Sequence, residues 1–141
     1  MPDEEARILS QDHLEPIARD ECMQRLRAQG VGRLGVEVRG RIAIYPVNYA
    51  VDDSSVLFRT NEGRKMRGAG SCEVAFEVDS IEPEAHAGWS VVIHGEPEDI
   101  TGEAETIPDT VQPWAGRKEY LVRIRPRTIS GRRVIPPSYL L

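Results

Sequence analysis

The chain has 141 residues, of which 40% are hydrophobic and 29% are charged, and this composition is typical of one globular domain with a buried core. Its formal net charge of −5 argues against a nucleic-acid binder that works by neutralising many phosphates. The cysteines, Cys22 and Cys72, have no CxxC spacing, so a disulfide framework is not expected. The acidic start of the sequence has no apolar segment like that of a secretory signal, and no run is long enough to span a membrane, which favours a cytoplasmic protein.

The start of the chain predicts an arm followed by one helix. Residues 1–19 read as irregular or extended. Asp20 is a candidate cap for a helix from Glu21 to about Gln29, and Gly30 stands where a helix commonly ends. The domain is therefore expected to cover 20–134, with a tail at 135–141.

Apolar periodicity predicts six strands in the rest of the chain. A short helix is expected at 62–69, and a loop or weak helix at 102–118. Short connections and few helices favour a mainly β protein, an antiparallel barrel that is closed or nearly closed. Several strands are apolar on both faces, which predicts that a second copy covers the outside in a homodimer. The expected strands are 31–38, 41–51, 56–60, 72–81, 88–100 and 120–129.

The clearest candidate for a ligand site is a basic corner after the third strand. Arg59 and Thr60 end that strand, Gly63 allows a close backbone approach, and Arg64 and Lys65 would enter the next helix. Guanidinium, hydroxyl and free helix N–H groups are the donors that a phosphate needs. A solvated basic helix face explains the same residues equally well.

A second candidate is the segment YPVNYA, residues 45–50. Pro46 removes a ladder donor, which places this strand at an edge or bulge. Asn48 puts an amide among apolar neighbours, where it needs a partner, so Pro46–Tyr49 could lie along a flat heteroaromatic ring. A simple edge-strand proline is the plainer interpretation.

Other chemistry is weakly indicated. Trp89, beside Ser90, is a core, interface or stacking residue, and Trp114 lies in a predicted loop. None of the three histidines has metal-ligand spacing to another histidine or a cysteine, so no metal site is expected. No motif for a nucleophilic catalyst is present.

The order of these segments resembles the pyridoxamine 5′-phosphate oxidase-like flavoproteins over about residues 18–134. The matching motifs are P-V-N-Y at 46–49, R-T-x-x-G-x-K at 59–65 and G-W-S-V at 88–91. The resemblance implies a six-stranded split barrel and a homodimer with FMN at the subunit interface. It implies that Arg59, Thr60 and Lys65 hold the FMN phosphate. Further cofactor contacts implied by it are Pro46, Val47, Asn48, Tyr49, Trp89 and Ser90, the last two from the partner chain.

The resemblance ends before the C-terminus. The vitamin-forming oxidases carry there a Trp- and Arg/His-bearing motif that this chain, ending RPRTISGRRVIPPSYLL, does not match. We therefore expect an FMN-dependent oxidoreductase on another small molecule, with no catalytic residue assigned and Tyr49, Trp114 and Arg117 as candidates to line the substrate side. The alternatives are a non-catalytic cofactor-binding protein, or a split-barrel protein that binds F420 or haem.

Overall fold

The computed structural model describes residues 14–61, 73–106 and 120–135, which hold nine strands, one α-helix and one 3-10 helix. The elements are β1 (Leu14–Ile17), α2 (Arg19–Ala28), β2 (Val31–Val38), β3 (Arg41–Asp52), β4 (Ser55–Thr60), β5 (Val74–Glu82), β6 (Ala87–Gly95), β7 (Pro97–Asp99), η1 (Thr101–Thr106), β8 (Tyr120–Ile124) and β9 (Thr128–Val134).

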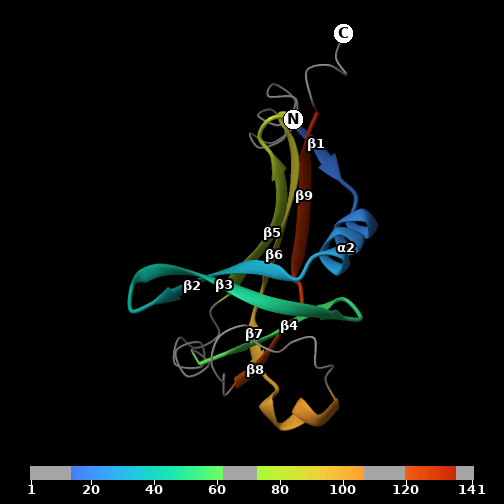
Figure 1. Ribbon diagram of the computed structural model, residues 1–141. Helices are drawn as coiled ribbons and strands as arrows, with labels where there is room; N and C mark the ends of the chain where they lie inside the picture. Colours follow the sequence, from blue (N-terminus) through green and yellow to red (C-terminus); the bar gives the residue numbers. More distant parts are fainter. Residues whose placement is uncertain (1–13, 62–72, 107–119, 136–141) are drawn as a thin grey trace.

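All strand pairs are antiparallel, in the order β1-β9-β6-β5-β2-β3-β4-β8-β7. In Figure 1 the strands β5, β6 and β9 lie side by side along one axis, and β2 and β3 cross this axis. The strands β4, β8 and β7 follow on the far side of β3. The predicted split barrel is confirmed, although the described residues contain more strands than the six expected.

One of the three extra strands is β1, which lies within the arm expected at 1–19 and pairs with β9. The other two arise where two paired strands bend at the same level. The expected strand 88–100 breaks at Glu96 into β6 and β7, and the expected strand 120–129 breaks into β8 and β9. Because β6 pairs with β9 while β7 pairs with β8, one long bent ladder joins the two halves of the sheet. Residues 130–134, expected to lie beyond the last strand, therefore belong to β9.

Helix α2 begins earlier than predicted. Its first backbone bond runs from Cys22 N–H to the Ala18 carbonyl, and the N-cap Ala18 makes no side-chain bond. Asp20 is therefore not the cap but a residue of the first turn, where its charge favours the helix dipole. The helix buries Cys22, Met23 and Leu26 against the sheet.

The core confirms the predicted alternation. Val74, Phe76 and Val78 of β5 are buried, as are Leu34 and Val36 of β2. Strands β4 and β8 are buried on both faces, because a second cluster of Leu57, Ile100 and Leu121 covers the side away from the main core. Of the expected segment 102–118, residues up to Thr106 are in η1, and the helix expected at 62–69 lies outside the described residues.

Candidate functional site

Strand β3 changes partners along its length, and this change creates the opening of the barrel. Its first part, from Arg41 to Asn48, pairs with β2. Its last part, from Tyr49 to Asp52, pairs with β4. Within the described residues, the edge of 41–48 that faces away from β2 has no strand partner. The backbone there is available to a ligand or to another chain.

Pro46 lies in this unpaired stretch. The Tyr49 N–H bonds the Gly30 carbonyl at 3.0 Å, so the N–H groups of odd-numbered residues point toward β2. Position 46 would direct its N–H to the open edge, where the missing proline donor breaks no ladder bond. The edge-strand interpretation of Pro46 is therefore correct.

Arg59 and Thr60 lie at the end of β4, just past the last β3–β4 pair, Tyr49 with Phe58. On the other edge of β4 the ladder with β8 continues, and there they pair with Leu121 and Tyr120. Thr60 is buried, and the buried Nε of Arg59 has no hydrogen-bond partner among the described residues. A buried guanidinium N–H without a partner is costly, which makes this atom a candidate to bind an anion.

Tyr49 points away from the opening. Its ring is 3% exposed and meets Phe76 edge-on at 5.0 Å, and its hydroxyl donates to the Leu26 carbonyl at 2.6 Å. Burial raises the pKa of the Tyr49 hydroxyl far above its ordinary value. Strand alternation thus turns this side chain into the core and away from the open edge of β3, where the sequence had placed it on the substrate side.

Asn48 is half-buried and faces the other way. Together with Tyr49 and Val51 it lines a groove of about 440 Å³ between β3 and the end of α2. This groove is lined by neither Pro46 nor Arg59. The opening between β3 and β4 is defined by the ladder itself: past its last pair, Tyr49 with Phe58, Pro46–Asn48 continue on β3 and Arg59–Thr60 on β4.

Trp89 and Ser90 are not part of this opening within a single chain. They lie on β6, which β5 and β2 separate from β3. Trp89 is 9% exposed, and the Arg25 guanidinium lies 5.1 Å from the centre of its ring. Ser90 points to the opposite face, where it lines a groove of about 250 Å³ with Val92 and Arg132.

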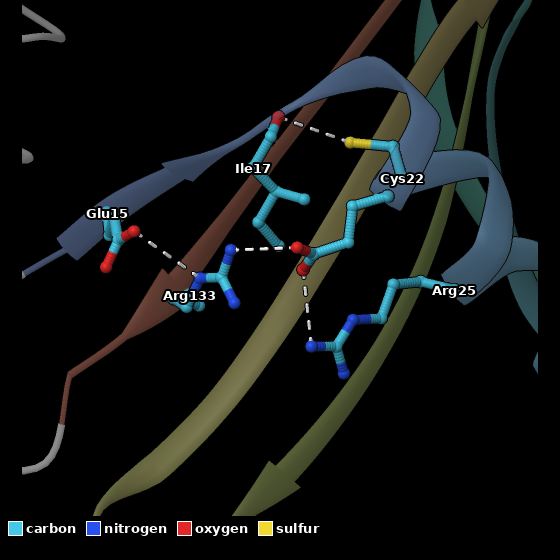
Figure 2. Close-up of polar contacts among 6 residues, drawn as sticks. Glu15, Ile17, Cys22, Arg25 and Arg133 are labelled. Atoms are coloured by element: carbon cyan, nitrogen blue, oxygen red, sulfur yellow. Dashed lines mark hydrogen bonds and ion pairs between the residues drawn. The ribbon is translucent and has the colours of Figure 1, made fainter.

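A charged network on α2 was not predicted (Figure 2). Glu21 accepts hydrogen bonds from Arg133 of β9 at 3.0 Å and from Arg25 at 3.3 Å, and Arg133 also approaches Glu15 of β1 at 4.0 Å. Desolvation raises the pKa of Glu21, but the two guanidinium groups outweigh it and hold the pKa below its usual value. The i,i+4 spacing of Glu21 and Arg25 was a visible signal. The contacts with β1 and β9 depend on the tertiary fold.

The remaining candidates from the sequence add no residue to the site described above. Lys65, Trp114 and Arg117 lie outside the described residues. Within the described ranges, no three metal-ligating side chains gather at one point. The one α-helix among them, α2, is too short and too polar to cross a membrane.

Comparisons with known proteins find relatives over most of the chain. A family model described as pyridoxamine 5′-phosphate oxidase matches residues 18–133. An uncharacterized protein of Mycobacterium tuberculosis is 30% identical over 131 residues, 86% of each chain. A Corynebacterium glutamicum crystal structure assigned to pyridoxamine 5′-phosphate oxidase is 30% identical, with a TM-score of 0.72 over 86% of this chain and 92% of that one. The FAD binding protein from Mycobacterium smegmatis is 28% identical, with a TM-score of 0.65 over 86% of this chain and 99% of that one.

Proposed function

Since the chain belongs to the pyridoxamine 5′-phosphate oxidase family, we propose that it binds a flavin nucleotide at the opening between β3 and β4. The observation that carries this proposal is the buried Nε of Arg59, which has no partner among the described residues. FMN is the nucleotide expected from the sequence motifs. FAD is the competing flavin, because it is the ligand named for the relative from Mycobacterium smegmatis.

The residues present fit such a ligand. Arg59 offers a planar fork of N–H donors at the end of β4, and a phosphate accepts such donors in pairs. Thr60 lies beside it, and Lys65 follows in the sequence. Across the opening, the edge of β3 around Pro46 and Val47, which has no strand partner on that side among the described residues, offers backbone groups to the polar edge of a flat ring, and apolar surface to its face.

We propose that a second copy of the chain completes the site. Ile42 and Ile44 of β3 are 80% and 69% exposed, and Val31 of β2 is 40% exposed. By strand register these three residues share one exposed face of β2 and β3, called the apolar patch below, and a homodimer would cover it. Trp89 and Ser90, which lie away from the opening in their own chain, would then approach the partner's flavin.

A bound flavin supplies hydride transfer, so the proposed activity is that of an oxidoreductase on a small molecule. The role of this chain is to bind and orient the cofactor and to exclude water from its face. No side chain is assigned as an acid or base. F420 remains the nearest alternative. Haem is less favoured: of the two described histidines, His86 lies in a turn, and His94 lies on β6, which β5 and β2 separate from β3 and the proposed opening.

The direct test is a visible spectrum of the purified protein, followed by calorimetric titrations with FMN, FAD and F420. Binding of FMN in preference to the other two supports the proposal as stated. Tighter binding of FAD would support the proposed flavin site and would identify its ligand as FAD in place of FMN. Binding of F420 alone, a haem Soret band, or no binding at all would overturn it.

The first prediction concerns Arg59. Arg59→Ala should weaken flavin binding about 10- to 100-fold, because it removes a charge-assisted contact to phosphate. Adding Lys65→Ala should weaken it further, while both proteins keep their far-ultraviolet circular dichroism. The matched control is Arg125→Ala, which removes the same charge from a side chain that is 69% exposed. Equal affinity in the Arg59→Ala and Arg125→Ala proteins would refute the phosphate assignment.

A further inference from the structure

The hydroxyl of Tyr49 links the open strand to the end of helix α2. It donates to the Leu26 carbonyl at 2.6 Å, and the Gln29 N–H donates to the same oxygen at 3.4 Å. Carbonyls in the last turn of a helix lack the usual partner within the helix, and Tyr49 gives the Leu26 carbonyl a second donor that is much closer than the Gln29 N–H. The bond lies where β3 leaves β4, at the last pair of that ladder.

Helix α2 is a firm anchor for this link, because its other end is fixed to the opposite half of the sheet. Arg133 of β9 binds Glu21 at 3.0 Å, and the Cys22 thiol donates to the Ile17 carbonyl (Figure 2). A methyl group added at Gly131 of β9 would come within 2.5 Å of the Cys22 Sγ, so helix and strand are in close contact.

The ring of Tyr49, like its hydroxyl, makes a specific contact in the core. It packs edge-on against Phe76 of β5, at 5.0 Å between ring centres. Its neighbours in sequence, Pro46–Asn48, have a strand partner on the β2 side alone within the described residues. The Tyr49 contacts therefore restrain this stretch of β3 from the side of the helix.

We infer that Tyr49 is a positioning residue for the flavin, acting from inside the core without touching it. Its bond to Leu26 fixes the height and twist of β3 at the opening, so that Pro46–Asn48 meet the ring in one arrangement. The inference rests on the proposed flavin site. It differs from the sequence-based expectation, in which the Tyr49 side chain itself lines the pocket.

The test compares Tyr49→Phe with Ile93→Val. Tyr49→Phe removes only the hydroxyl. Ile93→Val removes one buried methylene from the same core cluster, on β6, and should lower stability by a similar amount. Both proteins are titrated with FMN and FAD, and amide hydrogen exchange of residues 41–49 is measured without flavin. Visible circular dichroism of the bound flavin reports the ring's orientation.

We expect Tyr49→Phe to weaken flavin binding roughly fivefold, to change the visible circular dichroism and to speed exchange in 41–49. Ile93→Val should leave all three as in the wild type. Unchanged affinity and exchange in Tyr49→Phe, with wild-type flavin binding intact, would overturn this inference alone. Equal losses in both variants would reduce Tyr49 to a general contributor to stability and overturn it too. A wild-type protein that binds no flavin would overturn the proposed function and this inference together.

Discussion

Glu77 and Asp79 lie two residues apart on β5, so both carboxylates project from the same face of the sheet. One nitrogen of Arg33, on the neighbouring β2, donates to both at 3.3 Å. Burial and the adjacent Asp79 raise the pKa of Glu77 to about 7. The residues directly opposite this group are Ser90, Val92 and Pro46, none of which titrates. One guanidinium thus faces two carboxyl groups, and the pair retains a proton near neutrality.

This shared proton predicts how stability depends on pH. The folded pKa of Glu77 lies above its unfolded value, so the folded state binds more protons between about pH 4.5 and 7. The stabilisation that comes from keeping Glu77 protonated is fully present below the unfolded pKa, and it is lost as the pH rises through the folded value of about 7. Glu77→Gln should remove this loss. After allowance for solvent screening, the free energy of unfolding of the variant relative to wild type should rise by on the order of 1 kcal/mol between pH 5 and pH 8.

Urea denaturation of wild type and Glu77→Gln at several pH values measures the effect. The control is Glu37→Gln, on an exposed position of β2. The same pH profile in wild type and Glu77→Gln would show that the pair does not hold a proton.

At the scale of the elements, the periodicity of apolar residues predicted where strands lie, because a strand's position depends on its own residues. The strand predicted at 31–38 is β2 with the same bounds, and Arg59 and Thr60 do end a strand. The opening of the β3–β4 ladder could not be predicted, because it depends on which distant strands pair with residues 41–48. The burial of Tyr49 was hidden for the same reason, since its partners Leu26 and Phe76 come from other elements.

The paired bends at β6–β7 and β8–β9 were also missed, although the sequence has Gly95 and Pro97 at the first of them, residue types that are typical of bulges and strand edges. Gly95 is the last residue of β6, and a Cβ there would lie 2.3 Å from the Arg125 carbonyl oxygen. The two bent strands therefore approach too closely for a side chain at this position. Sequence marks such a glycine but does not show what lies opposite it.

Gly95→Ala should therefore destabilise the fold by about 2–3 kcal/mol, because the bend must shift to admit the methyl group. Gly30→Ala is the matched control, since a Cβ at position 30 meets nothing within 4 Å. Both effects are measured by urea unfolding. A Gly95→Ala protein as stable as Gly30→Ala would show that the bend can relax without cost.

For the whole molecule, the apolar patch of Val31, Ile42 and Ile44 is an exposed surface that one copy leaves uncovered. Ala43 and Tyr45 alternate with these isoleucines and pack on the core, so β3 is apolar on both faces, as the sequence indicated. Full burial of an isoleucine side chain contributes roughly 1.5–3 kcal/mol. A second copy covering this patch would gain that stabilisation and close the open edge of β3 at the same time.

The double variant Ile42→Glu/Ile44→Glu should therefore convert a dimer into a folded monomer, because association would bury two carboxylates. Sedimentation velocity gives the oligomeric state, and circular dichroism checks the fold. Ile81→Glu is the control, a similarly exposed isoleucine at the far end of β5 that should leave the dimer intact.

Flavin titration of the monomer separates two arrangements of the flavin site. Loss of binding would mean that the partner's Trp89 and Ser90 complete the site. Retained affinity would place the whole flavin site within one chain, and the proposed interface site would be wrong.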